Sequence, residues 1–159
     1  MAARWRLLRH DKLKMNSTLS RVIFSASEVN EESNRSSPAG GGTTTSATPV
    51  AWPSTAPLTV TFTKLYDDSR LIAYFGGTAY INSGTAVGTW GVTINGTNYD
   101  LAKFFFNVAL IHDGVSGVCA PISGVPAGTY VCDLTAKVTA NTLTNDANDF
   151  NSLSVREVS

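Results

Sequence analysis

The residues of this chain that could do chemistry are few and widely spaced. The two histidines are His10 and His112, and Asp113 follows His112 directly. A histidine beside an aspartate is only part of a catalytic triad, because a nucleophile must also lie within reach of the imidazole. The sequence places no cysteine or second histidine near His112, and it contains no GxSxG, P-loop, HExxH or CxxC motif. We therefore interpret His112 as a polar loop residue and expect no catalytic residues and no enzyme activity.

The two cysteines, Cys119 and Cys132, flank the stretch PISGVPAGT. Adjacent strands could bring them together as one intrachain disulfide if the geometry allows it. The alternative is a pair of thiols, with Cys132 buried on the apolar face of its strand. A protein assembled in a reducing cytoplasm would start with thiols.

The stretch NDANDFN, residues 145–151, groups Asp146 and Asp149 with several side-chain amides. Such oxygens are calcium ligands, but the stretch lacks the glycine and the terminal glutamate of an EF-hand loop. Hydrogen bonding within the loop is the better explanation of this composition. We expect no metal site and no other cofactor.

Charge is unevenly distributed along the 159 residues, although the formal net charge is zero. Residues 1–21 carry six lysines and arginines against Asp11 alone, whereas the sequence from Val50 onward is mildly acidic. This pattern predicts a basic N-terminal arm, residues 1–34, that anchors the protein to a partner. The arm residues assigned to this anchoring role are Arg4, Trp5, Arg6, Arg9, Lys12 and Lys14.

The arm also carries a weak helical pattern, because Trp5, Leu8, Lys12, Met15, Leu19 and Val22 follow spacings of three and four. A short helix and an arm that orders only on docking are both compatible with it. The basic residues could neutralise phosphates, but Trp5 is the only interleaved aromatic and the body has no basic face, so we do not expect nucleic acid as the partner. No run approaches eighteen apolar residues, so no membrane span is predicted either.

The chain changes character around residues 35–55, where Gly, Ser, Thr and Pro dominate. We predict a flexible linker there and an all-β domain over residues 56–159, an antiparallel β-sandwich or jelly roll. Short alternating segments separated by turn signals are typical of that architecture. We expect a hairpin turn at Asn95-Gly96 and a bulge or bend at Gly76-Gly77. The expected strands cover residues 58–66, 70–81, 87–94, 99–107, 130–138 and 150–158.

Three consecutive phenylalanines, residues 104–106, cannot all face one core, because side chains on a strand alternate between two faces. Lysine is rarely buried, so the face that carries Lys103 should point outward. That assigns Ala102, Phe104 and Phe106 to the core and leaves an apolar outer face that usually marks a protein interface. The predicted subunit interface consists of Tyr99, Leu101, Phe105, Ile72 and Tyr74; a covering loop or the arm is the alternative.

Five stretches together resemble a β-rich module from the C-terminal ends of tailed-phage virion proteins. They are VTFTKLYDDSRLIAYFGGTAYI, WGVTINGTNYD, FFFNVALIHDGVSG, GVPAGTYVCDLTAKV and NDFNSLSV. The module is similar in outline to the trimeric jelly rolls of the tumour necrosis factor and complement globular-head superfamily. The resemblance covers about residues 56–159 and implies a homotrimer on head decorations, head fibres or tail appendages. The fibrous segment common ahead of such modules is absent, since the chain has no Gly-X-Y repeat.

This resemblance implies a phage capsid decoration (cement) or head-fibre protein on the outer surface of the virion. The arm would bind the major capsid protein or another virion protein. The alternative within the virion is a tail appendage or receptor-binding tip whose exposed loops recognise a host-surface glycan or protein. A different class, a secreted or organellar binding module whose arm is cleaved, is also compatible with the sequence.

Overall fold

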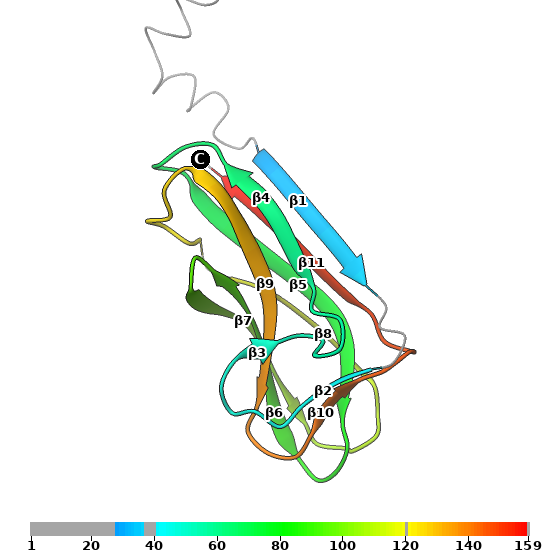
Figure 1. Cartoon of the computed structure of the whole chain (residues 1–159). Coiled ribbons are helices and arrows are strands. Elements are labelled where there is room, and N and C mark those ends of the chain that lie inside the picture. Colours follow the sequence, from blue (N-terminus) through cyan, green and yellow to red (C-terminus); the bar gives the residue numbers. More distant parts are fainter. Residues whose placement is uncertain (1–27, 37–40, 120, 159) are drawn as a thin grey trace, which may run out of the picture.

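The computed structural model describes residues 28–36, 41–119 and 121–158. Regular structure in these ranges is entirely β, and two antiparallel sheets pack against each other (Figure 1). The chain is therefore a jelly-roll-like β-sandwich, which confirms the predicted fold class. Over the same ranges, no helix has the length and apolar character that crossing a membrane requires. The predicted helix in the arm lies outside the described residues.

The first sheet is built around the long strand β5. Its order is β1 (Glu28–Ser36), β11 (Asn151–Val158), β5 (Arg70–Ile81), β10 (Leu143–Asn145) and β2 (Gly42–Thr44), and β8 (Asp113–Val118) also pairs with β5. Strand β11 pairs along β5 as far as Gly77, and β8 pairs along its other edge from Tyr74 to Ala79. Both ladders run through Gly76 and Gly77 without a shift of register, so of the two predicted alternatives, a bulge or a bend, the bulge is wrong.

The second sheet has the order β3 (Val50–Ala51), β9 (Gly128–Val138), β6 (Ala86–Ile94) and β7 (Thr97–Phe106), and β4 (Thr59–Lys64) also pairs with β9. Strands β6 and β7 form a hairpin in which Ile94 lies opposite Thr97. The two residues between them have the positive φ angles of a tight hairpin turn, 50° at Asn95 and 74° at Gly96. The predicted turn is confirmed.

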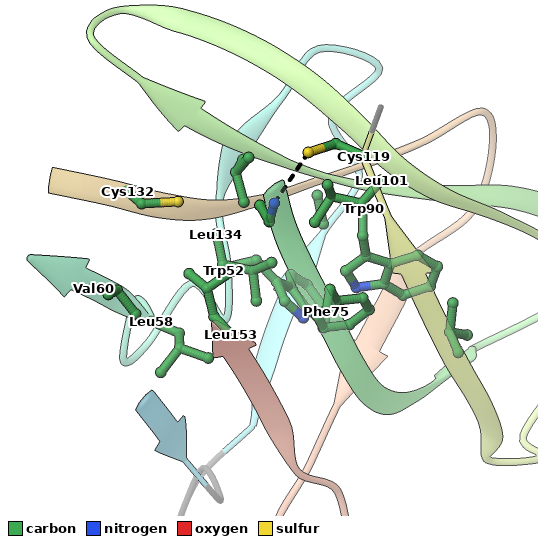
Figure 2. Packing of buried hydrophobic residues seen from close by; sticks show 14 of the residues in the cluster. Trp52, Leu58, Val60, Phe75, Trp90, Leu101, Cys119, Cys132, Leu134 and Leu153 are labelled. Atoms are coloured by element: carbon green, nitrogen blue, oxygen red, sulfur yellow. Dashed lines mark hydrogen bonds between the residues drawn. The ribbon is translucent and has the colours of Figure 1, made fainter. Parts of the chain in front are cut away.

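The core lies between the sheets and follows the alternation of the strands. In β11 every second side chain is buried, and β4 behaves in the same way. Aromatic rings fill the middle: Phe75 of β5 stacks on Trp90 of β6 with 5.8 Å between ring centroids. Leu134 and Leu153 approach them from β9 and β11 (Figure 2).

The predicted linker is in part a component of the domain. Trp52 follows β3 and is 0% exposed, its backbone N–H donates to Leu134 O at 2.9 Å, and its indole N–H donates to Asn151 Oδ1 at 3.3 Å. Strands β2 and β3 also come from this stretch, and β1 takes residues from the predicted arm. The described β-structure therefore begins before residue 56. Hydrophobic alternation does not indicate these strands, because they are short or polar and form through backbone pairing.

A β-bulge in β7 changes which side chains face the core. Trp90 pairs with Ala102 while the next residue, Gly91, pairs with Asp100, so Leu101 is an extra residue in β7. Beyond this point the alternation shifts by one. Leu101 is buried and Tyr99 packs against the core, although simple alternation places both on the outer face.

The bulge does not change the predicted orientation of the three phenylalanines. Phe106 is fully buried, and Ala102 and Phe104 pack against the core, whereas Phe105 is 61% exposed. Lys103 shares the outer face with Phe105, as the sequence predicts. The alternation argument holds for these residues because all of them follow Leu101 in the chain.

Candidate functional site

Four apolar side chains stand exposed at the end of β7 and in the loop that follows it. Their exposed fractions are 61% for Phe105, 50% for Val108, 68% for Leu110 and 52% for Ile111. We call these four residues the apolar loop patch. Single exposed apolar residues are ordinary, but several of them within seven residues of sequence are typical of a surface that contacts another molecule.

The backbone holds the apolar loop patch in place. Leu110 has a φ of 61°, a left-handed conformation that is uncommon for a branched apolar side chain. Its N–H donates to the carbonyl oxygen of Ile81, the last residue of β5, at 2.8 Å. An unfavourable backbone conformation persists only where its surroundings fix it, and such positions are concentrated at functional sites.

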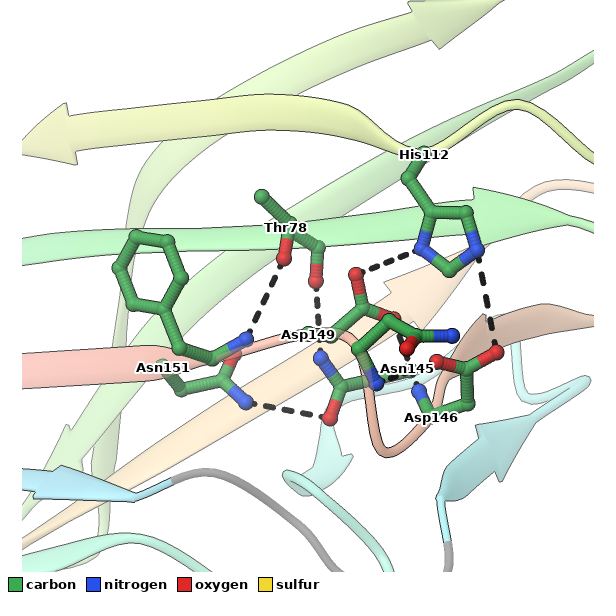
Figure 3. A network of polar contacts seen from close by, with 8 residues as sticks. Thr78, His112, Asn145, Asp146, Asp149 and Asn151 are labelled. Atoms are coloured by element: carbon green, nitrogen blue, oxygen red, sulfur yellow. Dashed lines mark hydrogen bonds and ion pairs between the residues drawn. The ribbon is translucent and has the colours of Figure 1, made fainter.

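His112, the last residue of the same loop, is fixed by a second set of contacts (Figure 3). Its Nδ1 lies 2.7 Å from Oδ1 of Asp149, whose side chain is completely buried, and its Nε2 lies 3.7 Å from Oδ2 of Asp146. The imidazole also packs on the ring of Tyr80, with 4.6 Å between centroids. His112 therefore joins the β7–β8 loop to the β10–β11 loop.

The β10–β11 loop is shaped by its own carboxylates and amides. Asp146 N–H donates to Asp149 Oδ2 at 2.8 Å, and Asp149 N–H donates to the carbonyl oxygen of Asp146 at 3.0 Å. Asn145 donates to Thr78 O at 2.8 Å and accepts from Asn151 at 3.2 Å. The prediction that this stretch is stabilised by hydrogen bonding within the loop is confirmed.

His112, Asp146 and Asp149 also have the ligand types that a metal ion requires. The ligand atoms of His112, Asp146 and Asp149 all lie within 4.8 Å of one another, so they are the described residues that could hold a cation. Here the imidazole itself lies between the two carboxylates. The hydrogen bond to Asp149 raises the pKa of His112, and the negative charges of Asp149 and Asp146 add to this, while burial acts in the opposite direction.

This arrangement predicts how stability depends on pH. Because the pKa of His112 is raised on folding, protonated His112 stabilises the fold fully below its unfolded value, near 6.5. That contribution is lost as the pH rises through the folded value. We expect His112→Gln to reduce the free energy of unfolding more at pH 5.5 than at pH 8.5, by about 1 kcal/mol or less because the pair is partly exposed.

Urea unfolding of both proteins at the two pH values measures this difference. Asp113→Asn, a change beside His112 in the sequence, is the control and should leave the pH dependence of the wild type in place. If His112→Gln lowered the free energy of unfolding equally at pH 5.5 and pH 8.5, protonated His112 would not be the source of the pH dependence.

The structure does not bring the five predicted interface residues to one surface. Tyr99 and Leu101 face the core, and Phe105 is exposed on the outer face of the second sheet. Ile72 is half-buried and Tyr74 is 36% exposed on β5 of the first sheet. Of the five, Phe105 belongs to the apolar loop patch and Tyr74 lies on a different face of the molecule.

Both cysteines are buried free thiols in the structure. Cys119 Sγ accepts a hydrogen bond from Ala73 N–H at 3.1 Å, next to β5, while Cys132 lies in β9 of the second sheet (Figure 2). Burial raises the pKa of Cys119 and raises that of Cys132 to about 12, so neither is a reactive thiolate at neutral pH. The alternative of buried thiols therefore describes this structure.

The predicted anchoring residues, Arg4, Trp5, Arg6, Arg9, Lys12 and Lys14, lie outside the described residues. Sequence reasoning missed Val108, Leu110 and Ile111, although the run VALI between two polar residues was a readable signal. It also missed the pairing of His112 with Asp149, which joins residues far apart in the chain and has no sequence signal.

The jelly-roll-like sandwich and its apolar loop patch are consistent with a structural or binding role. No protein-family model matches the sequence, and no curated protein matches it.

Several solved structures are similar in shape at low sequence identity. Eiger TNF from S. frugiperda matches with a TM-score of 0.42 and 12% identity, over 80% of this chain and 92% of that one. A chain of infectious bursal disease virus, Gt strain, matches with a TM-score of 0.42 and 10% identity, over 82% and 34%. The carbohydrate-binding module CBM36 in complex with calcium and xylotriose matches with a TM-score of 0.33 and 14% identity, over 80% and 98%.

Proposed function

We propose that this chain is a non-enzymatic structural protein of a virus particle that assembles as a homotrimer. The observation that carries the proposal is the apolar loop patch, Phe105, Val108, Leu110 and Ile111, which lies at the end of β7 and on a loop fixed by contacts of Leu110 and His112. Burying such side chains against another subunit removes apolar area from water and is the main favourable term in association.

Two further features support this role. Charged residues make up only 15% of the chain, so its surface is weakly charged and rich in Ser, Thr and Asn. The order of the strand segments resembles the trimeric modules of tailed-phage virions. On this basis the protein is a capsid decoration or head-fibre protein, located on the outer surface of the particle.

The basic N-terminal arm supplies the second contact in this proposal. Its six lysines and arginines within residues 1–21 suit an acidic surface of the major capsid protein or of another virion protein. A decoration protein of this kind stabilises the shell by mass action, because it binds the assembled state and not the free subunits. A tail appendage is the competing location, and copy number per particle separates a few copies from hundreds.

The solution mass of the full chain tests the assembly state. One chain has a mass of 16.9 kDa, so light scattering on a sizing column should give three times that value at micromolar concentration. A mass of 16.9 kDa across the whole concentration range would contradict the proposal. A dimer would keep the patch as an interface but exclude the trimer.

A further inference from the structure

A groove on the outer face of the first sheet has no part in the proposal above. It crosses β1, β11 and β5, the three strands that lie side by side along one edge of the molecule (Figure 1). Its volume is about 450 Å³, within the range of small-molecule sites. The side chains that line it on the outer face belong to Ser33, Tyr74, Ser152 and Ser154, with Gly76 between them.

The register of the sheet explains the shape of this groove. Ser33 pairs with Ser154, and Ser154 pairs with Tyr74, so two hydroxyls and one aromatic ring form a row across three strands. In the next row on the same face, Ser152 pairs with Gly76. Because Gly76 has no side chain, the space beside the Tyr74 ring stays open.

An ion pair lies beside the groove, and the register also places Arg35 of β1 next to Ser152. The Arg156 guanidinium lies 5.5 Å from the centroid of the Tyr74 ring and donates to Glu31 Oε2 at 2.8 Å. Glu31 also accepts from the hydroxyl of Ser154 at 2.9 Å. The residues that line the groove are all uncharged, and the outer-face side chains among them offer hydroxyls and an aromatic ring, which favours an uncharged ligand.

From this lining we infer that the groove binds a neutral oligosaccharide. A sugar ring has hydroxyls that donate and accept hydrogen bonds. The hydroxyls of Ser152 and Ser154 already donate to the carbonyl oxygen of Gly76 at 3.0 Å and to Glu31 Oε1 at 2.9 Å, so their lone pairs can accept hydrogen bonds from the sugar hydroxyls. It also has an apolar face of C–H groups, which packs on the part of the Tyr74 ring that the Arg156 guanidinium leaves exposed, since Tyr74 is 36% exposed. The length of the groove across three strands, about 10 Å at the usual strand spacing, accommodates two or three sugar units. This site lies on the sheet face and does not depend on the trimer.

Gly76 provides a direct test. An added Cβ there would lie 3.2 Å from Ser152 Oγ and project into the groove, and the backbone of Gly76 is one that alanine can adopt. Gly114 lies on the same face, on the neighbouring strand β8, and a Cβ there meets nothing within 4 Å. Gly76→Ala and Gly114→Ala are therefore matched variants, one inside the groove and one outside it.

The experiment is a titration of the ¹⁵N-labelled full chain, followed by amide chemical shifts. The probes are neutral trisaccharides of glucose, galactose, mannose, xylose and N-acetylglucosamine, with the trisaccharide of galacturonic acid as the charged comparison. We expect at least one neutral trisaccharide to shift the amides of Tyr74, Gly76 and Ser154. Gly76→Ala should weaken that binding about tenfold, the effect of losing one good aromatic or hydrogen-bonded contact, and Gly114→Ala should leave it unchanged.

Three results would overturn the inference. The first is that no neutral trisaccharide shifts these amides at millimolar concentration. The second is binding that Gly76→Ala and Gly114→Ala affect equally, which would place the ligand elsewhere. The third is preference for the acidic trisaccharide, which would contradict the charge argument.

Discussion

Replacing Trp52 with alanine should lower the free energy of unfolding by about 3–5 kcal/mol, the usual loss for removing a large buried aromatic side chain. Trp52 is 0% exposed and connects three parts of the sandwich through hydrogen bonds. Its N–H donates to Leu134 of β9, its carbonyl accepts from Leu58 and its indole donates to Asn151 of β11. The substitution leaves a cavity and also leaves the buried Asn151 oxygen without this donor.

Urea unfolding followed by tryptophan fluorescence or circular dichroism measures the loss. Val131→Ala is the control, because Val131 is an exposed residue of β9 and should change stability by no more than about 0.5 kcal/mol. A fragment that begins at residue 56 should not fold cooperatively, because it lacks β1, β2, β3 and the buried Trp52. A loss below about 1 kcal/mol in Trp52→Ala would show that the residues before 56 are dispensable to the core.

Replacing Leu110 with asparagine should abolish self-association while leaving the subunit folded. Asparagine tolerates the left-handed backbone at this position better than leucine does. It removes an exposed apolar side chain whose burial in an interface contributes about 1.5–3 kcal/mol. A trimer repeats this contact in every subunit, so the combined loss should shift the full chain to monomer at micromolar concentration.

Light scattering of the full chain, with circular dichroism as the check on folding, measures both effects. Leu65→Asn is the matched control, because Leu65 is likewise an exposed leucine, 50% exposed, but lies in the loop between β4 and β5. That variant should keep the assembly state of the wild type. A trimeric Leu110→Asn protein, or equal weakening by the two substitutions, would exclude the apolar loop patch as the subunit contact.

The strands that could be predicted are those whose side chains alternate over a single buried face. The segment 70–81 is predicted with its observed bounds, and 58–66 and 130–138 differ from β4 and β9 by only a few residues. Strand β1 could not be predicted in this way. Its sequence, EVNEESNRS, is polar apart from Val29, as suits a strand at the edge of a sheet that forms by pairing its backbone with β11.

Strand β8 could not be predicted from the sequence because of its glycines. Its sequence, DGVSGV, has low β-propensity because of its two glycines. A Cβ at Gly117 would come within 2.5 Å of the carbonyl oxygen of Leu101, so the glycine is required where β8 crosses the bulge of β7. Gly77 is similar, since a Cβ there would lie 2.8 Å from the carbonyl oxygen of Phe150. These glycines signal close packing, which a sequence alone cannot distinguish from a turn or a bulge.

The candidate site was predicted only in part, and the bulge explains why. One extra residue at Leu101 turns the side chains before it to the other face, so the predicted outer face contains two residues that belong to the core. Phe105 lies beyond the bulge and is exposed on the outer face, as predicted, while its role in a subunit interface stays a prediction. The contacts that fix the patch, Leu110 to Ile81 and His112 to Asp149, join distant residues and depend on the completed fold.

Strand β5 gives the molecule two unlike ends. Its first residue, Arg70, lies across β11 from Glu28, where β1 begins, and its last residue, Ile81, holds the apolar loop patch. Twelve residues of strand separate these ends by about 40 Å. In the proposed cyclic trimer all subunits would point in the same direction, so every β1 would begin at one pole and every patch would lie towards the other. Such a trimer would be polar, and attachment through one pole would turn the other pole outward.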